Sequence, residues 1–168
     1  MTTIHFTTHI NAPIHKVFDL NRDIDIHKQS TSKSNETAIA GKTSGLINLN
    51  ETVTWRGKHF GFYLTHKSLI SEMEIPTYFV DEMIEGRFKS FKHRHTFTEE
   101  NGITIMKDEI RYETPFGIFG KLFDTLLLKN HLTNFIIERN QFIKNLADRK
   151  STRLNSSHVS QSRIPSSA

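Results

Sequence analysis

Apolar residues recur at helical spacing from Ile118 to Leu146, over a stretch longer than most helices of globular proteins. Pro115 and Gly117 separate this stretch from the chain before it. Its N-terminal half is apolar around much of its circumference, which is typical of a buried helix. A strongly bent sheet can wrap such a helix and cover one of its faces. The apolar positions are Ile118, Phe119, Leu122, Phe123, Leu126, Leu127, Leu132, Phe135, Ile136, Phe142, Ile143 and Leu146.

The chain before this helix alternates apolar and polar residues, as half-buried strands do. A first strand is predicted at Thr2–Ile10, and two short helices are predicted after it, to about Asn21 and over Ile24–Gln29. Six further strands are predicted at Glu36–Ala40, Gly45–Trp55, Phe60–Ser71, Thr77–Glu85, Lys89–Thr98 and Ile103–Glu113. We therefore expect an α+β fold in which a curved antiparallel sheet of about seven strands wraps around the long C-terminal helix.

The bulk properties limit the class of protein. A length of 168 residues suits a single domain. The absence of cysteine excludes a disulfide framework, a zinc site with thiolate ligands and a cysteine nucleophile. No apolar run approaches the ~20 residues that cross a bilayer, and the N-terminal residues lack the apolar region of a signal peptide. We therefore expect a cytoplasmic protein.

The composition changes abruptly in the segment Asp148–Ala168, which is rich in serine and has no apolar periodicity. It begins with DRKSTRLNSSH, which is identical to the in-frame translation of a common short-read sequencing adapter. The later SRIPSSA is similar to another part of the same adapter. We interpret residues 148–168 as a non-native, disordered tail and residues 1–147 as a single ligand-binding domain. The alternative is a natural disordered basic tail.

The tail also accounts for most of the net charge. The whole chain has 22 basic and 18 acidic residues. The tail contains Arg149, Lys150, Arg153 and Arg163 against Asp148, which leaves 18 basic and 17 acidic residues in the domain. A nearly neutral domain with interspersed charges has no electrostatic footprint for nucleic acid, so we expect no nucleic-acid partner.

Several short motifs occur in a characteristic order. They are Ile10-Asn11-Ala12-Pro13-Ile14 followed by Val17-Phe18, Pro76–Glu82 (PTYFVDE), Gly86-Arg87-Phe88, Phe91–Phe97 (FKHRHTF), Asp108-Glu109-Ile110 and Thr114–Gly120 (TPFGIFG). Together they resemble the SRPBCC superfamily of START-like, polyketide cyclase/dehydrase-like and coenzyme-Q-binding-like proteins. The resemblance covers nearly all of residues 1–147. It implies a helix-grip fold with a hydrophobic ligand cavity between the sheet and the C-terminal helix.

The strand predicted at Lys89–Thr98 places His93 and His95 on the same face as two phenylalanines, so both histidines are expected to point toward the helix. On the next strand, Asp108 and Tyr112 lie on the apolar-biased face. Two registers are open, because a four-residue loop places His93 opposite Asp108 and a tight two-residue turn places His95 there. Either register puts a histidine beside an inward carboxylate.

This histidine–aspartate pair has three interpretations. It can act as a general acid and base on a ligand carbonyl, with Tyr112 as a further donor. It can also be a buried polar network that satisfies itself and fixes the register of the hairpin. A metal site with His93, His95 and Asp108 as ligands is the third, but no clear fourth ligand accompanies them. We expect no metal and no cofactor.

The cavity wall is expected to come from the inner strand faces and the front half of the helix. The leading hypothesis is a binding protein, without catalysis, for an apolar or amphipathic small molecule such as a lipid, an isoprenoid or a polyketide-like ring. The predicted ligand-binding residues are Trp55, Phe62, Leu64, Phe91, His93, His95, Asp108, Tyr112, Phe119, Phe123 and Leu127.

Two other functions remain open. A cyclase- or dehydratase-type enzyme would use His93, His95, Asp108 and Tyr112 as its catalytic residues, and a protein-interaction module would have a filled core. The segment Phe116–Leu128 is expected to be a core helix. Its alternative is an amphipathic segment that makes transient contact with a membrane. The oligomeric state is left open.

Overall fold

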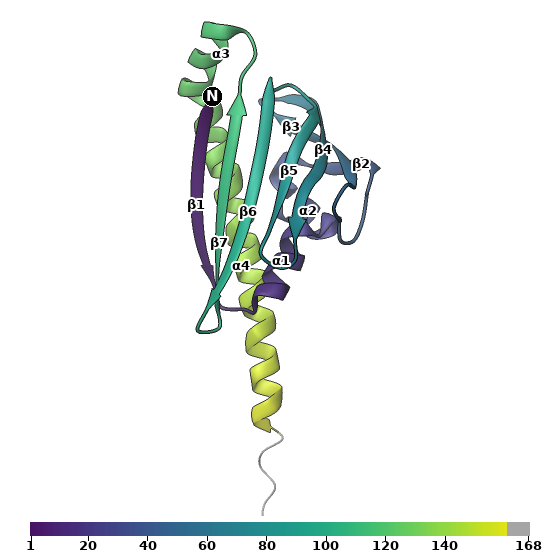
Figure 1. The fold of residues 1–168 in the computed structure, drawn as a ribbon, viewed down its shortest axis with the longest axis vertical. Coiled ribbons are helices and arrows are strands. Elements are labelled where there is room, and N and C mark those ends of the chain that lie inside the picture. Colours follow the sequence, from purple (N-terminus) through teal and green to yellow (C-terminus); the bar gives the residue numbers. More distant parts are fainter. Residues whose placement is uncertain (161–168) are drawn as a thin grey trace, which may run out of the picture.

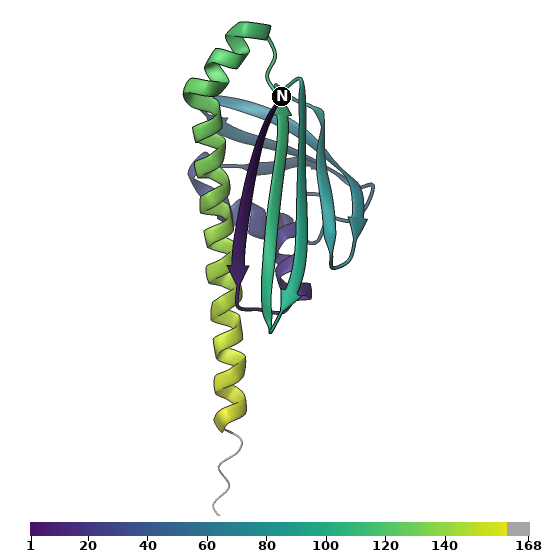
Figure 2. The same cartoon turned by 60° about the vertical axis from the view of Figure 1, so that its left-hand side comes forward.

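The computed structural model describes the backbone of residues 1–160 and the side chains of residues 1–148. Seven strands form one antiparallel sheet in the order β1-β7-β6-β5-β4-β3-β2, so the first and last strands in the sequence are neighbours. The long C-terminal helix runs beside the curved sheet (Figures 1 and 2). The strands are β1 Thr2–Ile10, β2 Thr37–Gly41, β3 Thr52–His59, β4 Phe62–Glu74, β5 Tyr78–Glu85, β6 Ser90–Glu100 and β7 Ile103–Glu113.

Two short helices follow β1, as predicted. They are α1 Ile14–Arg22 and α2 Ile24–Ser30, and a short 3₁₀ turn, η1 Ser32–Ser34, leads from them to β2. The Asp23 side chain caps α2 by accepting hydrogen bonds from the backbone N–H groups of Asp25 and Ile26. The α+β arrangement predicted from the sequence is confirmed.

The hairpin between β6 and β7 sets the register of the central strands. Asn101 and Gly102 both have positive φ, at 53° and 76°, and Glu100 pairs with Ile103. These features define the two-residue turn, so His95 lies opposite Asp108. The register with the four-residue loop is therefore excluded.

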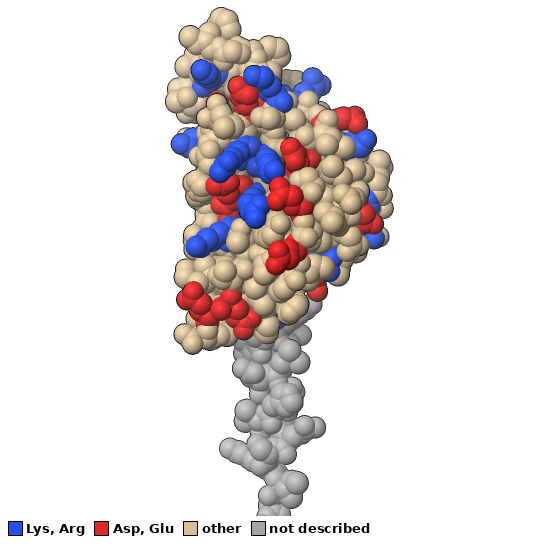
Figure 3. Space-filling view, viewed as in Figure 1, with Lys and Arg blue, Asp and Glu red and all other residues tan. Residues whose placement is uncertain are grey.

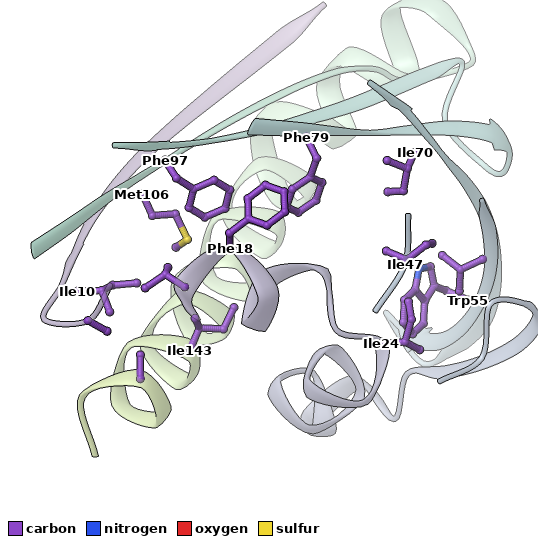
Figure 4. Packing of buried hydrophobic residues seen from close by; sticks show 14 residues of the cluster. Ile10, Phe18, Ile24, Ile47, Trp55, Ile70, Phe79, Phe97, Met106 and Ile143 are labelled. Carbon is purple, nitrogen blue, oxygen red and sulfur yellow. The ribbon is translucent and has the colours of Figure 1, made fainter. Parts of the chain in front are cut away.

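The main core lies between the sheet, α1 and the C-terminal helix (Figure 4). Phe18 of α1 packs edge-on against Phe79 and Phe97 of the sheet, with ring centroids 5.6 and 5.3 Å away. Ile143 and Ala147 of the helix belong to the same cluster. This packing fixes the helix against one end of the sheet.

The strand predicted at Gly45–Trp55 begins only at Thr52. The residues before it form a loop that hydrogen-bonds back to the short helices, through Gly45 O with Ile24 N–H and through Ile47 N–H with Arg22 O. The first part of this loop thus pairs with the ends of the short helices, and backbone bonds to the strand β4 begin only at Asn50 and Glu51, which bond to Ile70.

The C-terminal helix has three parts, α3 Gly117–Phe123, a π-helical turn η2 Asp124–Leu128, and α4 Lys129–Ser160. Figures 1 and 2 show that α3 extends past the end of the sheet. The prediction that the N-terminal half of the helix is buried is therefore wrong for most of its apolar side chains, although Leu128 packs with Ile4 of β1 and Ile110 of β7. The exposed apolar residues there are Phe116, Ile118, Phe119, Leu122, Phe123, Leu126 and Leu127.

The helix continues into the first part of the C-terminal tail. Helix α4 runs to Ser160, so the backbone of residues 148–160 is helical where disorder was expected. Residues 161–168 lie outside the described residues. Within the described part of the chain, no helix combines the length and apolar character needed to cross a membrane.

Candidate ligand cavity

A cavity of about 180 Å³ lies between the sheet and α4. Strands β3 to β6 supply most of its wall, and α2 and α4 close the other side. Its wall is mainly apolar and aromatic, with contributions from Val53, Trp55, Leu64, Ile70, Phe79, Phe88, Phe91, Leu132, Phe135 and Ile136. Ionisable side chains also line it, among them His27, Glu36, His59, His66, Asp81, His93, His95 and Arg139.

Five of the residues predicted to bind a ligand line this cavity: Trp55, Leu64, Phe91, His93 and His95. Each lies on the inner side of β3, β4 or β6, where strand alternation placed it.

The remaining predicted residues lie elsewhere. Phe62, Phe119, Phe123 and Leu127 do not line the cavity and are 72%, 78%, 41% and 53% exposed. The helix lines the cavity with Leu132, Phe135, Ile136 and Arg139. The sheet begins to cover the helix within η2, where Asp124 and Leu128 are buried, and helical periodicity alone does not show where that coverage starts.

Tyr112 and Asp108 are buried but do not line the cavity. The Tyr112 hydroxyl donates to Asp124 at 2.5 Å, and Thr2 donates to the other oxygen of the same carboxylate. Burial and Asp124 raise the pKa of Tyr112. Tyr112 therefore joins β7 to the π-helical turn, and it is not placed to donate to a ligand.

Asp108 lies behind the cavity wall and holds both histidines. His93 Nε2 is 2.9 Å from Asp108 Oδ1. His95 Nδ1 is 2.8 Å from the same oxygen, without the alignment of a good hydrogen bond. The Asn140 amide of α4 donates to Asp108 Oδ2 at 2.7 Å. The carboxylate thus connects two strands and the helix.

Burial and electrostatics set the protonation of this group. Burial, followed by the neighbouring His93, lowers the pKa of His95 to about 3, against the opposing effect of Asp108. Burial by itself raises the pKa of Asp108, but its interactions with His93 and His95 outweigh that effect and hold this pKa well below the usual range. The group is therefore an ionised carboxylate beside a neutral His95 near pH 7.

The same three side chains have the donor set of a metal site. The ligand atoms of His93, His95 and Asp108 lie within 4.8 Å of one another. Imidazole and carboxylate ligands suit zinc or ferrous iron. Among the described residues, the group has no fourth histidine or acidic ligand, and Asp108 is already hydrogen-bonded on both oxygens. The geometry of His93, His95 and Asp108 therefore suits a hydrogen-bonded network at least as well as a metal site.

A second polar cluster, which the sequence analysis missed, lies at the other side of the cavity. Glu36 Oε2 is 2.8 Å from His27 Nε2, and Glu36 Oε1 is 3.5 Å from His59 Nε2. His59 Nδ1 in turn lies 3.0 Å from His131 Nε2 of α4. The Trp55 ring stacks on His27 at 4.1 Å. These residues come from α2, β3, α4 and the loop before β2, so no local pattern links them.

Electrostatics keeps the Glu36 carboxylate ionised. Burial raises the pKa of Glu36, but hydrogen bonds from His27 and His59 outweigh it and hold this pKa far below its usual range. Burial, and then His59, lowers the pKa of His131. Arg139 is also buried, and it donates to the side-chain and backbone oxygens of Asn21 at 3.1 and 3.0 Å.

Comparison with known proteins relates the chain by structure alone. No family model matches it, and no curated protein matches its sequence. A START superfamily protein from Mycobacterium smegmatis is similar with a TM-score of 0.66 and 9% identity, over 88% of this chain and 97% of that one. Ginseng major latex-like protein 151 from Panax ginseng has a TM-score of 0.63 and 14% identity, over 87% and 97%. The protein TTHA0849 from Thermus thermophilus has a TM-score of 0.64 and 16% identity, over 84% and 97%.

Likeness at such low identity establishes the fold and not the ligand or the chemistry. All three structures are matched over nearly their whole length. The chain has the helix-grip fold that START-like and major latex-like proteins share.

Proposed function

We propose that this chain binds an amphipathic small molecule in the cavity between the sheet and α4, without catalysis. The observation that carries the proposal is the cavity itself, whose wall is mainly apolar and aromatic and also contains buried polar groups. Ligand sites commonly have this composition, because the apolar wall gives affinity and the polar groups orient the ligand. The open space also argues against an interaction module with a filled core.

The size of the cavity favours the smaller members of the expected ligand class. An apolar cavity of about 150 Å³ is large enough for benzene. The space of about 180 Å³ therefore suits a single ring or a short branched chain. A long-chain lipid, a long isoprenoid or a fused polyketide requires α4 to move away from the sheet.

Uptake of small ligands by matched variants tests this proposal. Leu132 lines the cavity from α4, so Leu132→Trp is expected to fill part of it and to lower the affinity for single-ring ligands. Leu126 lies in η2, outside the cavity, and is exposed, so Leu126→Trp is the matched control. Equal binding to both variants, measured by calorimetry, would place the ligand elsewhere.

An acid–base enzyme is the second candidate function, and one observation favours it. His93 lines the cavity while its Nε2 atom is hydrogen-bonded to the buried Asp108, which orients the ring. A binding function is favoured over an enzymatic one because His93 and Asp108 are hydrogen-bonded to each other, and the Tyr112 hydroxyl is bonded to Asp124 instead of facing the cavity. Turnover of a bound carbonyl compound that is lost in His93→Gln would support the enzyme.

We also infer transient contact with a membrane through the apolar surface of α3 and η2. Figure 3 shows that charges of both signs are interspersed over the sheet, whereas the end formed by α3 is largely uncharged. Asp124, the one acidic residue in this segment, is buried against Tyr112. Lys121 and Lys129 are exposed, so the segment offers apolar side chains and positive charge to an anionic lipid surface.

A further inference from the structure

Three buried polar atoms of the cavity-lining residues have no hydrogen-bond partner among the described residues. One of them, His95 Nδ1, still lies 2.8 Å from the Asp108 carboxylate. The other two, the Ser68 hydroxyl oxygen on β4 and the Asp81 Oδ1 atom on β5, have no such ion pair. Ser68 is only 1% exposed, and both residues line the cavity. Buried polar atoms are hydrogen-bonded in most native structures, so an unpaired pair facing a cavity calls for an explanation.

Three other buried ionisable groups around the cavity do have hydrogen-bond or ion-pair partners. Glu36 is held by His27, and Asp108 is held by His93. Arg139 donates to Asn21. Ser68 and Asp81 therefore differ from Glu36, Asp108 and Arg139, because their hydrogen-bonding capacity is still available.

Strand pairing brings the two groups to one place on the inner face of the sheet. Asp81 lies opposite Ile70, and Ser68 is two residues before Ile70 on the same strand. Diagonal neighbours of this kind are about 7–8 Å apart across the two strands, so one ligand group can reach both side chains. On the other side, Asp81 lies opposite His93.

The chemistry of the two groups specifies their missing partner. A carboxylate oxygen only accepts, so Asp81 requires a donor from the ligand. A serine hydroxyl both donates and accepts, so Ser68 can donate to the group that binds Asp81. A ligand hydroxyl satisfies both at once. An ammonium group suits the site less well, because the buried cation Arg139 lines the same cavity and repels a second positive charge.

We propose that Ser68 and Asp81 form a hydroxyl-recognition site and that the ligand is a small hydroxylated ring. This inference rests on the proposed binding function and deepens it by naming the polar group of the ligand. The cavity volume of about 180 Å³ limits the ring system to one ring with short substituents. The hydroxyl lies against β4 and β5, and the ring lies against aromatic side chains such as Phe79 and Phe91.

A matched set of one-ring probes tests the inference on the full chain. The probes are 4-methylphenol, toluene, which lacks the hydroxyl, and benzylamine, which carries a cation. Calorimetry is expected to give a Kd for 4-methylphenol at least about tenfold lower than that for toluene, since hydrogen bonds to charged groups have this strength. Benzylamine is expected to bind more weakly than 4-methylphenol.

Three variants assign this preference to the two residues. Ser68→Ala and Asp81→Leu are expected to reduce the preference for the hydroxyl, with toluene binding retained. Ser71→Ala is the control, because the Ser71 hydroxyl is also buried without a partner but does not line the cavity. Ser68→Ala removes a buried, unpaired hydroxyl, so the variant is expected to fold as stably as the wild type.

The outcomes separate this inference from the proposed function. Equal affinity of the wild type for 4-methylphenol and toluene overturns the hydroxyl site and leaves cavity binding in place. A preference that persists in both Ser68→Ala and Asp81→Leu also overturns it. Failure of the wild type to bind any of the three probes overturns both proposals.

Discussion

Asp108 lies directly opposite His95 in the β6–β7 ladder, and its Oδ1 atom is 2.8 Å from His95 Nδ1. The same oxygen accepts from His93, and the second oxygen accepts from Asn140 of α4. One buried carboxylate therefore joins the sheet to the helix that closes the cavity. This connection predicts effects on both stability and its pH dependence.

Asp108→Asn is expected to lower the free energy of unfolding by about 3 kcal/mol. The substitution keeps the shape of the side chain but removes the charge that His93 and Asn140 bind. Loss of one partner from a buried, charged hydrogen-bonded group strongly destabilises the folded state. Urea unfolding measures the effect. Glu85→Gln is the control, because its pair with Lys67 is exposed and is expected to contribute less than about 1 kcal/mol. Similar losses in both variants would contradict the structural role of Asp108.

Stability is expected to fall as the pH drops from about 6.5 toward 3, in part because of His95. Its folded-state pKa of about 3 is below the unfolded value of 6.5, so only the unfolded state takes up a proton in this window. The loss approaches ~1.4 kcal/mol per pH unit for one group. Asp108 and Glu36 also have lowered pKa values, and their contributions are lost only as the pH falls below their unfolded values near 4.

Measurement between pH 6 and 5 therefore isolates the histidines from the carboxylates. Unfolding free energies of the wild type and His95→Gln, taken at half-unit intervals, are expected to show a shallower slope in the variant. A parallel pair of curves would mean that His95 titrates normally in the folded protein.

Phe119→Asp is expected to leave the melting temperature unchanged and to reduce binding to anionic vesicles. Phe119 is exposed on α3, so the change removes apolar contact area and adds a negative charge without disturbing the core. Sedimentation with vesicles of phosphatidylcholine and phosphatidylserine measures the binding. Ile39→Asp on β2 is the control, because Ile39 is exposed and apolar but far from α3 in the sequence and outside this segment. Equal vesicle binding by both variants would exclude α3 as the membrane contact.

Tyr112→Phe is expected to lower the free energy of unfolding by about 1–2 kcal/mol and to leave ligand affinity unchanged. Its hydroxyl binds Asp124 in the interior and does not face the cavity, so the change leaves a buried carboxylate oxygen with one partner fewer. Urea unfolding and calorimetry with the same protein sample separate the two effects. A loss of ligand affinity at unchanged stability would show that Tyr112 belongs to the binding site.

The sequence predicted those features that depend on local patterns. Alternation placed β1 and β7 within a residue or two, and it directed His93 and His95 inward. The choice between two registers required the conformation of Asn101 and Gly102, because both turns are compatible with the residues. Local pattern therefore defines which residues share a face but not always which residues meet.

The remaining features depend on how far one element covers another. Phe119 and Leu132 both fit the apolar face of one helix, yet only Leu132 lines the cavity, since the sheet ends before α3. The Glu36 contacts with His27 and His59 join three distant segments. Helical periodicity carries no information on either relationship, so these parts of the site emerge only from the tertiary structure.

Native mass spectrometry of the gently purified chain tests the central claim most directly. Cavity binding predicts a recurrent adduct of small mass that organic extraction releases, present in the wild type and in Leu126→Trp and depleted in Leu132→Trp. A ligand-free mass for the wild type, together with no uptake from a panel of hydroxylated and unsubstituted single-ring compounds, would contradict the account.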